Sequence, residues 1–155
     1  MEIKDSGDRT QYSTGAVRDC KEGKGRCDLM PLGVLYSFFN DVIFKDIEDF
    51  RASGSTMDLL IAICHFGESM KWNPYEMFIE ASKHFEAGAK KYGENNWQKG
   101  IPVHSYIDSA VRHYLKYRAG WNDEPHDRAF IWNLMCGIWT AENHPELNDF
   151  SEVSK

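Results

Sequence analysis

This sequence has no long apolar run, no excess of basic residues and no closely spaced cysteine pair. Its 155 residues contain no window of about 18 uninterrupted apolar residues, so a membrane-spanning helix is not expected. Eighteen Lys and Arg against 24 Asp and Glu give a net charge of −6, which argues against binding of duplex nucleic acid, because that needs a basic surface. The first ten residues, MEIKDSGDRT, lack the apolar core of a secretion signal.

The four cysteines indicate a reducing environment. Cys20, Cys27, Cys64 and Cys136 include no pair at CxxC spacing, so a structural zinc site is not expected. Cys64 and Cys136 lie in apolar helical stretches, where a free, buried thiol is the usual state. We therefore expect a cytoplasmic protein made of a single domain, as its length and 42% hydrophobic content allow.

Apolar residues recur at steps of three and four from residue 31 onward, and no β-type alternation of any length is present. This pattern predicts an all-α fold of about five helices. A polar, glycine-rich arm at residues 1–30 precedes the helices, and a polar tail at residues 143–155 follows them. The predicted helices begin at Pro31, Ser55, Asn73, Ser105 and about Asp123.

The same pattern predicts where some of these helices begin and end and which of their faces are buried. The first helix is expected to run unbroken to Phe50, and the fourth to be capped by Ser105 with Asp108 in a capping box. The last helix is apolar nearly all round between residues 129 and 138, so it should be the buried centre of the fold. The second helix is expected to bury Met57, Leu60, Ile61 and Cys64.

Asn133 is the most informative polar residue, because it lies in the middle of the apolar last helix. An unpaired buried amide would cost about 1–3 kcal/mol, so Asn133 needs either a structural hydrogen bond or a ligand. His126 lies on the same stripe two turns earlier, which favours a pocket as much as a purely structural role. The roles of Asp108 and Glu86 are also open between structure and function. A capping box would explain Asp108, and an exposed ion pair with Lys90 would explain Glu86.

Acidic side chains on several helices are a usual way in which a helical bundle builds a divalent-metal site. Since oxygen ligands are plentiful and closely spaced cysteines are absent, we expect Mg²⁺ or Mn²⁺ rather than zinc. Such ions hold phosphate oxygens, and Lys91, Arg112 and Lys116 could neutralise the remaining charge. Tyr92 and Trp97 are candidates for stacking on a nucleobase, although both also suit a core.

Several short motifs add a family resemblance. They are TGAVRD at residues 14–19, GKGRCDL at 23–29, GAKKYG at 88–93, NNW at 95–97, DSAVRH at 108–113, then His126 and Trp132-Asn133. In this order they resemble the bacteriophage dATP/dGTP diphosphohydrolase family, including MazZ-type enzymes related to the all-α MazG nucleotide pyrophosphohydrolases. The resemblance covers residues 14–29 and 84–139.

The resemblance implies a MazG-like helical bundle that hydrolyses a purine deoxynucleoside triphosphate, dGTP or dATP, to the monophosphate and pyrophosphate with Mg²⁺ or Mn²⁺. It implies a phage enzyme in the cytoplasm of the infected host cell, where MazZ-type proteins supply dGMP for the synthesis of 2-aminoadenine DNA. It also implies a homodimer or homotetramer whose active sites use helices from more than one subunit.

The chain departs from the family pattern in two places. Residues about 34–75 look like a helical insertion ahead of a core at residues 74–142, placed to cover the site or to form an interface. MazG enzymes pair a glutamate cluster with a later ExxD motif, and here Glu124–Asp127 spells ExxD at an unusually long spacing. Asp108 lies at a better spacing from Glu86, so both assignments stay open.

The leading hypothesis assigns roles to named side chains. Metal ions would be held by acids among Glu80, Glu86, Asp108, Glu124 and Asp127, with Glu86, Asp108 and Glu124 catalytic. A water would attack the α-phosphate, and pyrophosphate would leave. The predicted substrate contacts are Arg18, Lys24, Arg26, Lys91, Tyr92, Asn96, Trp97, Arg112, His113, Lys116, His126 and Asn133.

The sequence leaves two alternative functions open. One is a triphosphohydrolase that releases tripolyphosphate, with His126-Asp127 as an HD dipeptide, His84 or His113 upstream and Asp149 downstream. The other is a non-enzymatic nucleotide-sensing or interaction module whose acids are only surface charge. Product identity separates the two enzymes, and a lack of turnover would favour the module.

Overall fold

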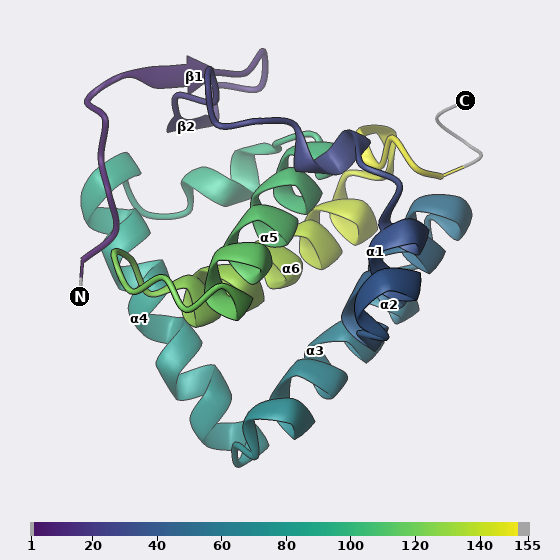
Figure 1. Ribbon diagram of the computed structural model, residues 1–155. Helices are drawn as coiled ribbons and strands as arrows, with labels where there is room; N and C mark the ends of the chain where they lie inside the picture. Colours follow the sequence, from purple (N-terminus) through teal and green to yellow (C-terminus); the bar gives the residue numbers. More distant parts are fainter. Residues whose placement is uncertain (1, 152–155) are drawn as a thin grey trace.

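The computed structural model describes residues 2–151 and shows a helical bundle, as the sequence predicts (Figure 1). Residue 1 of the predicted arm and residues 152–155 of the predicted tail lie outside the described residues. The elements are β1 (Arg9–Gln11), β2 (Val17–Asp19), η1 (Cys27–Leu29), α1 (Leu32–Phe39), α2 (Val42–Ser53), α3 (Thr56–Met70), α4 (Pro74–Tyr92), η2 (Asn96–Lys99), α5 (Val103–Arg118), α6 (His126–Asn143) and η3 (Pro145–Leu147).

Helix α6 is the centre of the bundle. It packs along α5, with α4 on one side and α1 to α3 on the other (Figure 1). Every residue from Ala129 to Leu134 is at most 8% exposed, which confirms the predicted central helix. Among the described residues, no helix has both the length and the apolar character that crossing a bilayer would need.

The ends of α4 form as their residues predict. Asn73 Oδ1 accepts a hydrogen bond of 2.9 Å from the Tyr75 backbone N–H, and Pro74 occupies the first helical position. Gly93 ends the helix with φ of 91°, a conformation that favours glycine. These local signals fix the helix that carries His84 and Lys91 to the site.

The arm contains a small β-hairpin, the one sheet within residues 2–151. Strands β1 and β2 pair antiparallel, with Thr10 opposite Arg18. The side-chain amide of Asn96 bonds to the backbone of β2 as a neighbouring strand would. Its Oδ1 accepts from Val17 N–H at 2.9 Å, and its Nδ2 donates to Val17 O at 2.7 Å. This pairing fixes the hairpin to the segment between α4 and α5 (Figure 1).

The first predicted helix is in fact two helices. The chain breaks at Asn40, which has φ of 51°, and Asp41 Oδ1 then caps α2 by accepting from Ile43 N–H at 3.1 Å. The prediction of one unbroken helix to Phe50 was therefore wrong. Asparagine tolerates left-handed backbone, and its side chain gives a weaker break signal than glycine or proline.

The predicted buried face of α3 was also wrong. Met57, Leu60 and Ile61 are 59%, 42% and 37% exposed, and Cys64 is exposed as well. The core instead receives the neighbouring stripe, Leu59, Ala62, Ile63 and Phe66. The expectation of a buried thiol holds for Cys136, which is 1% exposed, and fails for Cys64.

Helix α5 begins at Val103, so Ser105 and Asp108 do not cap it. Both lie inside the helix and are buried, at 0% and 2% exposure. Ser105 Oγ instead accepts hydrogen bonds from Tyr12 and Lys21 of the arm. The positions that looked like a helix start are therefore contacts between α5 and the arm.

Candidate active site

A cavity of about 650 Å³ lies between the arm, α4, α5 and the beginning of α6. We call it the arm cavity. Its volume is in the range of pockets that enclose a small organic ligand. Nine of the twelve predicted substrate contacts line it: Arg18, Lys24, Lys91, Tyr92, Asn96, Arg112, His113, Lys116 and Asn133.

The arm cavity is strongly cationic, although the whole chain carries a net charge of −6. Its acidic lining residues are Asp5, Asp19 and Glu124. Positive side chains around a low-dielectric cleft concentrate an anionic ligand. The seven cationic lining residues are Lys4, Arg18, Lys21, Lys24, Lys91, Arg112 and Lys116.

Arg18 joins the hairpin to the floor of the cavity. Its Nη2 donates to Asn133 Oδ1 at 2.9 Å, and its guanidinium lies 5.0 Å from the Tyr106 ring centre and 5.6 Å from that of Trp132. Asn133 Nδ2 donates to Ala129 O at 2.8 Å. The buried amide predicted to need partners therefore has two, and it also faces the cavity.

Arg112 anchors the glycine-rich segment that follows the hairpin. It donates to the carbonyls of Lys24 and Gly25, at 3.2 Å each, and pairs with the Asp108 carboxylate. Asp108 Oδ1 also accepts from Cys27 N–H at 2.7 Å. Asp108 is thus a buried counter-ion that positions Arg112 and the arm.

Residues 3–6 near the N-terminus also line the arm cavity. Lys4 N–H donates to Glu124 Oε1 at 2.7 Å, and Lys4 Nζ lies 2.5 Å from Asp123 Oδ2. Lys91 Nζ donates to the Lys4 carbonyl and lies 3.8 Å from a carboxylate oxygen of Asp5. Burial lowers the pKa of Lys91, and nearby carboxylates oppose that effect.

Two histidines meet beside Glu124. His113 Nδ1 and His126 Nδ1 are 2.9 Å apart, and His126 Nε2 lies 2.7 Å from Asp123 Oδ1. His126, 2% exposed, sits behind His113, which lines the cavity. Burial holds the pKa of His113 well below its usual value, and the nearby His126, Lys116 and Arg112 act in the same direction.

Two polar atoms in the cavity wall have no hydrogen-bond partner among the described residues: His84 Nδ1 and Trp132 Nε1. Their rings are 5.4 Å apart. Burial lowers the pKa of His84 to about 4, and the charges of Arg128 and Arg18 act in the same direction, so the imidazole is neutral at pH 7. Neither residue was among the predicted substrate contacts, because the signal is burial without a partner, which only the folded chain shows.

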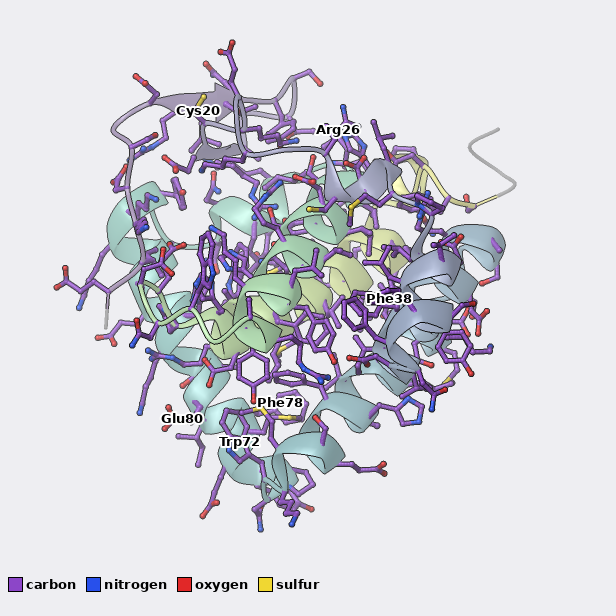
Figure 2. All side chains as sticks on the ribbon, viewed as in Figure 1. Cys20, Arg26, Phe38, Trp72, Phe78 and Glu80 are labelled. Atoms are coloured by element: carbon purple, nitrogen blue, oxygen red, sulfur yellow. The ribbon has the colours of Figure 1, made fainter. Side chains whose placement is uncertain are left out.

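Three predicted substrate contacts lie elsewhere. Arg26 is paired with Asp28 at 2.7 Å, on the outer side of the arm (Figure 2). Trp97 packs edge-on against Phe85 and Trp139 and lines a neighbouring cavity of about 310 Å³. His126 is the buried residue behind His113 described above.

The five acids predicted to hold metal are dispersed. Glu80 pairs with Lys83 at 2.6 Å near the corner where α3 meets α4. The arm cavity is far from this corner, because Cys20 of the arm, which lines the cavity, lies near the opposite end of α4 (Figure 2). Glu86 and Lys90 form the exposed ion pair that was one of the two expectations for them, at 3.4 Å. Asp127 accepts from Arg128 N–H. Within the described part of the chain, Glu124 is the member of this set that lines the arm cavity.

Comparison with known proteins places these helices in a family. The family model described as "dATP/dGTP diphosphohydrolase, N-terminal" matches residues 52–150. Curated proteins and solved structures give no match. The matched range contains α3 to α6, and so the helical walls of the arm cavity, while the hairpin precedes it. The chain belongs to the dATP/dGTP diphosphohydrolase family and is a nucleoside triphosphate pyrophosphohydrolase.

Proposed function

We propose that the arm cavity binds dGTP, dATP or both and releases the deoxynucleoside monophosphate and pyrophosphate. The observation that carries this proposal is the lining of the cavity, where seven cationic side chains face three acids. A triphosphate carries the opposite charge at neutral pH. The cations also match the needs of the reaction, because negative charge builds on the leaving pyrophosphate in the transition state.

In the proposed complex, the phosphates lie against the arm and α5. Arg18, Lys91 and Arg112 provide fixed charge, because each is held by further hydrogen bonds or ion pairs. Lys24 and Lys116 add charge at the rim of the same cavity. A water attacks the α-phosphorus in line with the departing pyrophosphate, and the cations offset the charge on the leaving group.

The purine base lies against His84 and Trp132. Trp132 Nε1 is a hydrogen-bond donor and purines offer ring-nitrogen acceptors, while a neutral imidazole provides a further polar atom. Pairing with a base would satisfy buried groups whose lack of partners costs about 1–3 kcal/mol each. Asn96 has a different role, because both ends of its amide are bonded to Val17 of the hairpin.

The proposal includes a requirement for a divalent cation, Mg²⁺ or Mn²⁺, which enters with the triphosphate as part of the substrate. The carboxylates predicted to hold resident metal ions do not fit that role together. Asp108 is paired with Arg112, and Glu80 and Glu86 are paired with lysines on exposed surface. We assign no catalytic step to a metal held by that set.

The biological setting and the assembly are part of the same proposal. The motifs of the arm and core support a role in bacteriophage nucleotide metabolism, in the 2-aminoadenine DNA pathway. A homodimer or homotetramer is supported by the exposed stripe Met57, Leu60, Ile61 and Cys64 of α3, which has the spacing of a helix-packing face.

The proposed function is tested by pyrophosphate release from each dNTP and each ribonucleotide. We expect turnover of dGTP or dATP, and a loss of at least about 10-fold in kcat/KM for Lys91→Ala, since a charge-assisted contact is worth about 1.5–3 kcal/mol. Lys99→Ala, an exposed control outside the cavity, should retain activity. No release from any dNTP would contradict the proposal.

The HD-type alternative finds less support in the structure. Asp149, its required downstream acid, is exposed and bonded to the backbone N–H of His104 at 2.9 Å. His104 belongs to the first turn of α5, away from the His113–His126 pair. Release of tripolyphosphate rather than pyrophosphate would nevertheless favour that alternative, and the same assay detects it.

A further inference from the structure

We propose that His113, His126 and Glu124 form a binding site for one divalent transition-metal ion, such as Mn²⁺, Co²⁺ or Zn²⁺, in the wall of the arm cavity. Each residue offers one ligand atom, and these atoms all lie within 4.8 Å of one another. Two imidazoles and one carboxylate are a donor set that suits transition metals, whereas Mg²⁺ prefers oxygen ligands alone. The site is therefore different in composition from the carboxylate set expected from the sequence.

The separation of the two imidazoles fits this site. Metal–nitrogen bonds of about 2.1 Å place two nitrogen ligands about 3.0–3.4 Å apart at the angles of octahedral or tetrahedral coordination. His113 Nδ1 and His126 Nδ1 are 2.9 Å apart. The two nitrogens, which come from α5 and α6, thus already lie close to the separation that a shared metal ion requires.

The orientation of His126 gives a second, independent argument. Its other nitrogen, Nε2, faces the Asp123 carboxylate at 2.7 Å, and a carboxylate there accepts the imidazole proton. This leaves the lone pair of His126 Nδ1 on the side of the ring that faces His113. Such a carboxylate–histidine pair is the usual support of a metal-bound imidazole, because it fixes both the tautomer and the ring orientation.

The arm supports the carboxylates of the site. Lys4 N–H donates to Glu124 Oε1 at 2.7 Å, and Lys4 Nζ pairs with Asp123. Glu124 keeps its second oxygen for a metal. His113 and Glu124 both line the arm cavity, so the coordination positions that the protein leaves open face that space. Only one consequence rests on the proposed function, namely that phosphate oxygens of the nucleotide occupy those positions.

Metal titration of the full chain without nucleotide tests this site. After removal of metal with EDTA and desalting, Co²⁺ is added and its visible absorption recorded, followed by competition with Zn²⁺ and with Mg²⁺. We expect one Co²⁺ per chain, displaced by Zn²⁺ and much less readily by Mg²⁺. No Co²⁺ binding would overturn the site and leave a plain hydrogen bond between the two histidines.

Variants assign the binding to these side chains. Glu124→Gln and His113→Ala should each weaken Co²⁺ binding by at least about 100-fold, and Asp123→Ala by at least about 10-fold. Glu68→Gln and His144→Ala, matched controls outside the cavity, should bind Co²⁺ normally. Glu124→Gln keeps the shape of the side chain, so it remains informative if His113→Ala fails to fold. Unchanged binding in Glu124→Gln would overturn the site.

Failure of the metal site can be told apart from failure of the proposed function. A chain that binds Co²⁺ through these residues but releases no pyrophosphate from any dNTP keeps the site and contradicts the function. A chain that releases pyrophosphate while Glu124→Gln leaves metal binding unchanged keeps the function and contradicts the site.

Discussion

Arg18 of the hairpin donates a 2.9 Å hydrogen bond to Asn133 in the buried centre of α6. The two residues are 115 positions apart in the sequence, and their contact joins the arm to the helical core. It also places a guanidinium over both the Tyr106 and the Trp132 rings at the floor of the cationic cavity. The cavity therefore depends on the arm being docked.

Replacing Asn133 with Leu should both destabilise the fold and weaken nucleotide binding. The substitution removes the side-chain acceptor of Arg18 Nη2, while Nη1 still reaches the Ser105 carbonyl at 3.3 Å, and we expect it to lower the free energy of unfolding by about 1–3 kcal/mol. Urea denaturation of Asn133→Leu, Arg18→Ala and the double variant measures the coupling between the two side chains. Strictly additive effects would show that the hydrogen bond does not join arm and core.

Arg112→Ala should lower the free energy of unfolding by about 3–5 kcal/mol, because it leaves the Asp108 carboxylate buried without its cation. The exposed pair Lys45–Asp49 has the same i,i+4 spacing and offers the control. Lys45→Ala should change the free energy of unfolding far less, because an exposed ion pair contributes little to stability. Equal costs in chemical denaturation would contradict the view of Asp108 as a buried counter-ion.

The stability of the nucleotide-free protein should fall as the pH is lowered from about 6.5 to about 4. These are the pKa values of His84 in the unfolded and the folded chain. Unfolded His84 gains a proton below about 6.5, whereas the folded residue stays neutral to about 4, because it is buried. The unfolded state binds more protons in this window, so His84 adds a slope of at most about 1.4 kcal/mol per pH unit. Urea denaturation across the window should give a smaller slope for His84→Gln, and an unchanged slope would contradict the burial of a neutral imidazole.

Leu60→Glu should dissociate the proposed oligomer without unfolding the chain. Leu60 is 42% exposed in the centre of the apolar stripe on α3, so a charge there is tolerated by a monomer and opposed by a packed interface. Sedimentation equilibrium should show a smaller species for the variant, while circular dichroism stays unchanged. A wild-type chain that sediments as a monomer would contradict the proposed assembly.

Sequence patterns predicted those parts of the fold that depend on near neighbours. Asn73 and Gly93 mark the ends of α4, because capping and left-handed backbone are local properties. The buried face of α3 was not predictable from spacing, since Leu59 and Ala62 on one stripe are as apolar as Leu60 and Ile61 on the next. Tertiary packing alone decides which of two apolar stripes is buried.

The residues of the candidate site likewise include some that the sequence predicts and others that only the folded chain brings together. Arg18, Lys91 and Arg112 lie within recognisable motifs and do line the cavity. The role of Lys4 could not be predicted, because its bond to Glu124 joins residues 120 positions apart. The meeting of His113 with His126 likewise depends on the angle at which α5 and α6 pack, which short motifs do not specify.

The identity of the products formed from dGTP and dATP in H₂¹⁸O, determined by ³¹P NMR and mass spectrometry, tests the central claim most directly. Attack on the α-phosphorus predicts a deoxynucleoside monophosphate that carries ¹⁸O, together with unlabelled pyrophosphate. Deoxynucleoside plus tripolyphosphate, which would mean that the 5′-oxygen leaves, or ¹⁸O in pyrophosphate, which would mean attack on the β-phosphorus, would contradict the account of α-phosphoryl attack with pyrophosphate as the leaving group.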